Sequence, residues 1–294
     1  MAQTVLHDEH VKLGASFTDF GGWDMPVRYS SDLLEHHAVR NAAGLFDISH
    51  MAELFISGTD ASAFLDAALV GMASEIAIGR AKYSMICNAK GGIIDDLIVY
   101  RLETERFLII ANASNREAVA SALRDRQAGF DVQVDDQSDD WALLAIQGPK
   151  ATGILQRLAS TDLAELKYYS IAESTVAGAA AYLCRTGYTG EDGFEVLVPA
   201  TEAATVWNKI LAEGAGDALT AAGLACRDTL RLEAGMPLYG HELDEQHTPF
   251  EAGLGKVVRL DEGHEFVGRE ALVKLTEPQE RLVGLVGEGK RAAR

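Results

Sequence analysis

Hydrophobic and polar residues alternate with two different periods along this chain, and the longer period predicts helices. Four segments have apolar residues at helical spacing and signals for a start and a stop. The first expected helix runs from Asp32, with Glu35 completing a capping box, to a stop at Gly44, and the second begins at about Asp60. The third runs from a Ser114–Glu117 capping box to Gly129, and the fourth from just after Thr201 to Gly214.

Short apolar runs between these helices predict β-strands. Residues 83–87 and 93–100 flank Asn88-Ala89-Lys90-Gly91-Gly92, so we expect a β-hairpin with a five-residue loop. Further strands are expected at residues 107–111, 141–146, 180–185 and 194–198. Because helices and strands do not alternate strictly and a hairpin is present, the pattern favours an α+β fold over a doubly wound parallel sheet.

The last apolar run, residues 281–287, also has the pattern of a strand, yet only seven residues follow it. A strand needs a neighbour for its backbone hydrogen bonds. We therefore expect either that this strand pairs with an earlier sheet or that it belongs to a domain that has been cut away.

Length and charge narrow the possible functions. The 294 residues are enough for two or more domains, and 48% hydrophobic with 24% charged residues is an ordinary globular composition. The formal net charge is 26 − 44 = −18, which disfavours binding to nucleic acid or to an anionic membrane surface. A small anionic ligand remains compatible with this charge, since a few convergent Arg or Lys side chains dominate the local field.

Cysteine and histidine positions argue against disulfide and metal sites. Cys87, Cys184 and Cys226 lie far apart with no paired spacing, so neither a disulfide framework nor a zinc ribbon is expected. His241 and His247 are six residues apart, whereas a zincin needs two histidines four apart on one helix face. No secretion signal and no apolar run of about 20 residues occurs, so we expect a cytoplasmic protein without a membrane span.

The pair Asp95-Asp96 stands at the start of the second hairpin strand. Side chains alternate across a strand, so the two carboxylates should face opposite sides, one solvated and one among Ile94, Leu97 and their apolar neighbours. A poorly hydrated carboxylate is able to accept a proton or orient a protonated amine. The pattern alone leaves open a solvated strand end with no function.

Glu195 interrupts an otherwise apolar strand just after a glycine-rich stretch, residues 185–193. The glycines allow turns and close approach of the backbone to a ligand, but a plain hairpin loop explains them equally well. A carboxylate within such a strand either faces water or accepts hydrogen bonds from a planar group. Two N–H groups of a heterocycle would suit it.

Residues 224–234 have helical spacing, which places Arg227 and Arg231 on one face and lets Asp228 pair with Arg231. Gly235 and Pro237 should end this helix. A salt-bridged surface helix is the simplest interpretation, because exposed ion pairs are common and weak.

Seven separated motifs occur in a fixed order: residues 20–27, 44–51, 83–85, 91–100, 187–193, 227–235 and 248–254. Together they resemble the T-protein aminomethyltransferases of the glycine cleavage system, from about His7 to Arg294. The resemblance implies a multi-domain, cloverleaf-like folate-binding fold. Its expected parts are a folate-binding core from residues 1–50 and 138–275, a second α+β lobe from residues 51–137, and the start of a truncated C-terminal β-barrel domain at residues 276–294.

The same resemblance implies the reaction. The methylene of an aminomethyl group on the dihydrolipoyl arm of lipoylated H-protein passes to tetrahydrofolate, which gives 5,10-methylenetetrahydrofolate and ammonia, without a metal. Asp96 is expected beside the reacting folate nitrogens, with Asp95 structural. Glu195 is expected to hold the pterin ring. The remaining expected pocket residues are Tyr83, Asn112, Tyr188, Arg227 and Met51.

Two related functions are alternatives. A folate-dependent demethylase of a small methylated amine or sulfonium compound would share the pterin-holding residues. A non-enzymatic folate-binding factor for iron–sulfur assembly is disfavoured, because its relatives have a cysteine in the stretch that here reads Arg185-Thr186-Gly187-Tyr188-Thr189-Gly190-Glu191.

Overall fold

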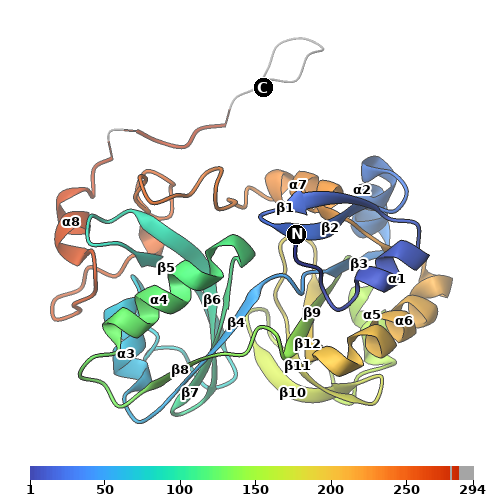
Figure 1. Cartoon of the computed structure of the whole chain (residues 1–294), viewed down its shortest axis with the longest axis horizontal. Helices are drawn as coiled ribbons and strands as arrows, with labels where there is room; N and C mark the ends of the chain where they lie inside the picture. Colours follow the sequence, from blue (N-terminus) through green and yellow to red (C-terminus); the bar gives the residue numbers. More distant parts are fainter. Residues whose placement is uncertain (279, 285–294) are drawn as a thin grey trace.

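The computed structural model describes residues 1–278 and 280–284, and it contains two large β-sheets side by side (Figure 1). The first sheet has the strand order β10-β11-β12-β9-β3-β13 and is antiparallel except where β13 pairs with β3. Its strands are β3 (Ala43–Asp47), β9 (Trp141–Gln147), β10 (Ile171–Val176), β11 (Ala179–Cys184), β12 (Gly193–Pro199) and β13 (Leu219–Ala221).

The second sheet is antiparallel throughout, in the order β5-β6-β7-β4-β8. It consists of β4 (Ala52–Ser57), β5 (Ala81–Cys87), β6 (Ile93–Glu103), β7 (Arg106–Ala111) and β8 (Gln133–Asp136). Its outer face is covered by α3 (Ala61–Ala68) and α4 (Arg116–Arg126), as Figure 1 shows on the left. The outer face of the first sheet is covered by α5 (Ala151–Gln156) and α6 (Ala203–Gly214).

A third apolar core lies between the two sheets and holds them together. Phe46 and Leu143 of the first sheet belong to the same buried cluster as Phe55 and Leu108 of the second. Both sheets therefore bury their two faces, one against helices and one against each other, which explains the continuous apolar runs in β7 and β9. A site between the sheets can draw side chains from both.

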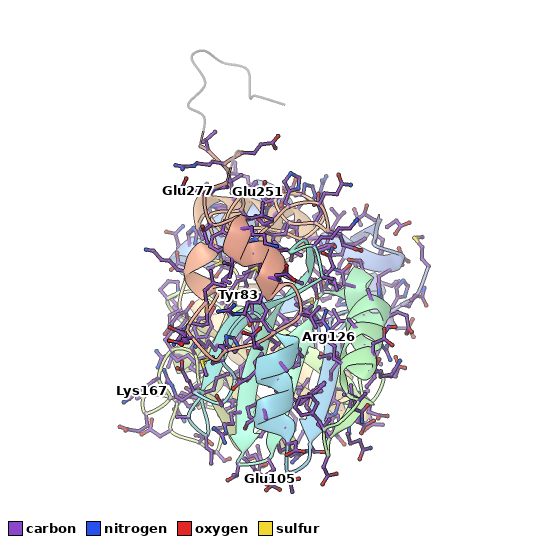
Figure 2. The ribbon with its side chains drawn as sticks, turned by 90° about the vertical axis from the view of Figure 1, so that its left-hand side faces the viewer. Tyr83, Glu105, Arg126, Lys167, Glu251 and Glu277 are labelled. Carbon is purple, nitrogen blue, oxygen red and sulfur yellow. The ribbon has the colours of Figure 1, made fainter. Side chains whose placement is uncertain are left out.

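Smaller elements cover one end of the first sheet (Figure 1). They are α1 (His7–Lys12), the hairpin of β1 (Ser16–Phe20) and β2 (Trp23–Arg28), α2 (Asp32–Asn41) and α7 (Leu224–Glu233). The chain then returns across β5 to α8 (Arg269–Lys274), and the described residues beyond α8 run away from it, with the N–H of Leu282 bonded to the oxygen of Glu251. Figure 2 labels Tyr83 of β5, which pairs with Ile98 in the middle of β6, and Glu105, which lies at the lower end of the same sheet between β6 and β7.

Most elements agree with their sequence predictions, including the α+β class and the 83–100 hairpin with its loop at residues 88–92. The first predicted cap is wrong. Ser31, not Asp32, accepts the hydrogen bond from the backbone N–H of Leu34, at 3.2 Å. Glu35 instead accepts backbone N–H groups of Tyr29 and Gly223, because tertiary donors compete with the local capping box.

Two further helix boundaries differ from prediction. α2 ends at Asn41, and Gly44 lies inside β3 rather than at a helix stop. At α4 the helix begins at Arg116, and its capping residue Asn115 makes no side-chain capping bond, so the predicted Ser114–Glu117 box does not form. Asn115 is used elsewhere, as a donor to Asp95.

The C-terminal predictions are only partly within the described chain. Of the expected strand at 281–287, residues 281–284 adopt no regular structure, and the rest lies outside the described residues. We propose the predicted domain division at residues 1–50 with 138–275, and 51–137. The membership of the two sheets supports it, because every strand of the second sheet falls within 52–136. In the part of the chain that the structure describes, no helix could cross a membrane.

Candidate active site

A cavity of about 320 Å³ lies between the two sheets. This volume is within the range of small-molecule sites. Its walls combine the tip of the β1–β2 hairpin, the β3–β4 connection, strands β5 and β6, the loop before β12, helix α7 and residues 236–241. The cavity therefore depends on segments from most of the chain.

All seven side chains predicted for the site line this cavity. They are Met51, Tyr83, Asp96, Asn112, Tyr188, Glu195 and Arg227. They come from both sheets and from α7, so only the folded chain brings them together. The roles assigned to them from the sequence stay predictions.

Two glycines shape the hairpin that presents the aspartate pair. Gly91 has a φ of +88°, a conformation that residues with a side chain rarely adopt. A Cβ on Gly92 would overlap the backbone oxygen of Glu245, because the backbone at Glu245 packs directly against Gly92. The next residue, Ile93, donates its N–H to the oxygens of Asp244 at 3.0 Å and His247 at 3.2 Å. The start of β6 is thus fixed by a distant segment.

Asp95 and Asp96 point to opposite sides of β6, as strand alternation predicts. Asp95 is completely buried and Asp96 lines the cavity. Asp95 accepts hydrogen bonds from the backbone N–H of Asn112 at 2.9 Å and from the side-chain amides of Asn112 at 2.9 Å and Asn115 at 2.5 Å. Burial and the nearby Asp96 carboxylate nevertheless raise the pKa of Asp95 to about 7.

Asp96 is held by two donors while keeping partial exposure to the cavity. The Tyr83 hydroxyl donates to Oδ2 at 3.0 Å, and the Asn112 amide donates to Oδ1 at 2.8 Å. Because the same amide nitrogen also donates to Asp95, Asn112 bridges both carboxylates. Burial raises the pKa of Asp96, and these two donors oppose that rise. The two aspartates titrate as a coupled pair that retains a proton to higher pH than isolated carboxyls.

Glu195 belongs to β12 and is 8% exposed. Thr186 donates its hydroxyl to Oε2 at 2.5 Å. Among the described residues Oε1 has no donor. Burial raises the pKa of Glu195, while Thr186 and the charge of Arg227 lower it. One oxygen of a buried carboxylate is therefore available to a ligand in the cavity.

Arg227 projects from α7 over the ring of Tyr188, with its guanidinium carbon 4.6 Å from the ring centroid. No acceptor within residues 1–278 and 280–284 is in hydrogen-bond range of this guanidinium, and burial lowers its pKa. The interpretation as a surface helix is therefore wrong for Arg227. It is also wrong for Arg231, which is 3% exposed; the predicted pairing with Asp228 is present at 2.8 Å, and Arg231 pairs with Glu242 as well.

The sequence prediction missed several cavity residues, of which His50 is the most informative. His50 is 3% exposed, and its buried Nδ1 has no hydrogen-bond partner in the described part of the chain. Burial and the positive charge of Arg227 lower the pKa of His50 to about 4, so the imidazole is neutral near pH 7. Its position beside Met51 in the 44–51 motif was the available signal. Tyr169 and Tyr239, which lie in no quoted motif, gave no such signal.

The cavity thus contains the carboxylates of Asp96 and Glu195, the guanidinium of Arg227, which has no acceptor among the described residues, and a neutral imidazole. Glu195 can accept N–H donors of a polar, planar molecule in this cavity, and the carboxylate of Asp96 offers a second acceptor to the same molecule. In the described residues no group of three or more His, Cys, Asp or Glu side chains is placed to hold a metal ion. Cys87, Cys184 and Cys226 are free and buried.

Residues 6–262 match the family model described as the GCVT N-terminal domain. The chain is 55% identical to the aminomethyltransferase of Saccharopolyspora erythraea, over 99% of this chain and 80% of that one. It is 53% identical to the aminomethyltransferase of Streptomyces avermitilis, again over 99% and 80%. The crystal structure of glycine cleavage system aminomethyltransferase T from Bartonella henselae matches with a TM-score of 0.88 and 37% identity, over 95% of this chain and 75% of that one.

Proposed function

Because the chain belongs to the aminomethyltransferase family that has the GCVT N-terminal domain, we propose that it performs the T-protein step of glycine cleavage. In this step the methylene of an aminomethyl group, attached to the dihydrolipoyl arm of H-protein, passes to tetrahydrofolate. The products are 5,10-methylenetetrahydrofolate, ammonia and the dihydrolipoyl H-protein.

One observation is central to this proposal: Asp96 and Glu195 come from different sheets yet face the same cavity, with Arg227 beside them. Two buried carboxylates in separate environments can serve two tasks, one in binding and one in chemistry. A transferase needs both tasks, because it must bind the acceptor and also assist the transfer of the group from the donor.

The side chains of the cavity fit tetrahydrofolate. Glu195 offers Oε1, which has no donor within the described residues, to the adjacent N–H groups of a pterin ring. Arg227 offers N–H groups that have no acceptor within the described residues, and Tyr188 and Met51 supply flat or flexible apolar surface. When bound, tetrahydrofolate supplies the amine nitrogens that receive the one-carbon unit.

Asp96 is the chemical group in this proposal. Its carboxylate accepts a proton from a reacting amine or stabilises the positive charge that develops on the transferred carbon and nitrogen. Tyr83 and Asn112 fix its orientation through their hydrogen bonds. Asp95 is buried on the opposite side of β6 and has a structural role, since it shares the Asn112 amide with Asp96. Correct positioning of two reactants can lower a reaction barrier by about 7–11 kcal/mol in ideal cases. Holding the two substrates in place therefore contributes to the rate independently of Asp96.

The decisive experiment measures ammonia release from aminomethylated H-protein with and without tetrahydrofolate. We expect release that is accelerated by tetrahydrofolate and accompanied by 5,10-methylenetetrahydrofolate. Ammonia release that is independent of folate would refute the proposal. Small methylated amines and sulfonium compounds are assayed in parallel, and faster turnover of one of these than of the H-protein substrate would favour the demethylase alternative.

A further inference from the structure

A buried chain of hydroxyl groups leads from the second sheet to the carboxylate of Glu195 in the first. Tyr100 lies on β6 of the second sheet and is completely buried. Its hydroxyl oxygen is 2.9 Å from Oγ1 of Thr186, which precedes β12 in the first sheet. Thr186 is 1% exposed and lies 2.5 Å from Oε2 of Glu195.

The direction of these hydrogen bonds follows from the acceptor at the end. An ionised carboxylate only accepts, so Thr186 uses its single hydroxyl proton toward Glu195. Tyr100 must then donate to Thr186. The Tyr100 oxygen is also 3.5 Å from Oε2 of Glu195, at the outer limit of a direct hydrogen bond. Thr186 therefore bonds Oε2 directly, and Tyr100 acts on the same oxygen mainly through its hydrogen bond to Thr186.

We propose that Tyr100 and Thr186 are positioning residues for Glu195: they fix Oε2, leave Oε1 for the ligand and keep the carboxylate ionised. The identity of that ligand as tetrahydrofolate rests on the function proposed above. The inference assigns a role in the site to a residue of the second sheet that does not line the cavity and touches no substrate.

The ionised form of Glu195 is the form expected to bind the ligand. A carboxylate accepts two N–H groups of a planar heterocycle, whereas a protonated carboxyl presents one acceptor and one donor and mismatches such a pair. Hydrogen bonds donated to an ionised group favour it over the neutral form. Loss of either hydroxyl should therefore move the protonation of Glu195 to higher pH.

The other charged or titratable groups around Glu195 are few. Arg227 on α7 favours the ionised form, and Cys184 on β11, which pairs with Glu195 in register, is buried and neutral. Tyr168 and Tyr169 approach from the connection before β10, and burial raises the pKa of both hydroxyls. None of these groups gains or loses charge as the pH falls from neutral and Glu195 takes up its proton.

The experiment compares wild type with Thr186→Val, Thr186→Ser and Tyr100→Phe. The first reading is the pH dependence of tetrahydrofolate binding, measured by calorimetry under anaerobic conditions. We expect the acid midpoint of binding to rise by about one pH unit in Thr186→Val and by less in Tyr100→Phe, with Thr186→Ser close to wild type. At pH well above the midpoint the affinities should converge.

The second reading needs no ligand. The infrared carbonyl band of protonated Glu195 is identified as the band that disappears in Glu195→Gln, and its titration is followed in each variant. The same upward shift is expected. If wild type binds no tetrahydrofolate at any pH, the proposed function fails, but this titration still tests the role of Tyr100 and Thr186.

Tyr29→Phe is the matched control. It removes a tyrosine hydroxyl that bonds Nδ1 of His10 at 2.8 Å, away from the cavity. This variant should lose some stability without moving the midpoint. The inference is overturned if Thr186→Val and Tyr100→Phe weaken binding equally at every pH, or if the Glu195 titration is unchanged in both. Should Thr186→Val fail to fold, Tyr100→Phe decides the outcome.

Discussion

The two carboxylates that face the cavity are held in different ways. Asp96 receives its donors, Tyr83 and Asn112, from its own sheet and the turn beside it, and a second carboxylate lies directly behind it. Glu195 accepts a hydrogen bond from Thr186, which in turn is bonded to Tyr100 of the second sheet, and it has the cation Arg227 nearby. Burial raises the pKa of both groups, but a like charge adds to this effect at the aspartate pair, whereas Arg227 opposes it at Glu195.

This difference separates two functions within one cavity. A carboxylate coupled to another retains a proton to higher pH than an isolated one, which suits a group that exchanges a proton during the chemistry. A neighbouring cation favours the ionised form of a carboxylate, which suits a group that only binds. The comparison predicts that changes near Asp96 alter turnover, while changes near Glu195 alter affinity.

The largest effect is expected from Asp96→Asn. This change keeps the size of the side chain but removes its charge and basicity, so turnover should fall by roughly 10²–10⁴-fold. Steady-state ammonia release measures turnover, and thermal unfolding checks that the fold is retained. If Asp96→Asn turns over almost normally while Asp95→Asn is inactive, the roles of the two aspartates are reversed.

The buried Asp95 should make stability depend on pH. An unfolded aspartate titrates near about pH 4, whereas the pKa of Asp95 in the folded protein is raised to about 7. The stabilisation from protonated Asp95 is therefore complete below about pH 4 and is lost as pH rises through 7. The free energy of unfolding of wild type relative to Asp95→Asn should fall by about 2–4 kcal/mol across that window. Urea unfolding at several pH values measures it, and a difference that does not vary with pH would contradict the assigned shift.

Glu195→Gln should act mainly on binding. It replaces one acceptor by a donor that opposes the N–H groups of the ligand, so the Kd for tetrahydrofolate should rise about 10- to 100-fold. Turnover at saturating folate should change far less. Glu173→Gln, at an exposed position of β10 in the same sheet, is the control and should bind normally. A large loss of turnover with unchanged Kd would remove the distinction between the two carboxylates.

The smallest effect is expected from Tyr83→Phe. Loss of one neutral donor raises the pKa of Asp96 further and loosens its orientation, which should lower turnover about 3- to 10-fold. The acid limb of the pH–rate profile should move to higher pH. An unchanged profile would show that Tyr83 does not control the protonation of Asp96.

Local patterns predicted the elements that rely on local interactions. The 83–100 hairpin and the helix ending at Gly214 follow from residues close together in the sequence, and both are present. The capping predictions at Asp32 and Ser114 were wrong because Glu35 and Asn115 bond to distant groups, Gly223 and Asp95. Capping rules consider only neighbours in sequence, so they miss such competition.

The site shows the same limit more strongly. The motifs, through the family resemblance, predicted seven residues that share one cavity, yet pattern alone treated Arg227 as part of a surface helix. The hydrogen bonds between Tyr100, Thr186 and Glu195 join residues up to 95 positions apart and on different sheets. No periodicity connects such residues, because their contact results from how the two sheets pack.

The contact at Gly92 and Ile93 has a consequence for the synthesis of the protein. Ile93 needs the backbone oxygens of Asp244 and His247, which leave the ribosome about 150 residues later. At usual bacterial and eukaryotic elongation rates this delay is roughly 8–30 s. Throughout that time the beginning of β6 lacks these partners, so the nascent second sheet can form without its finished active-site edge.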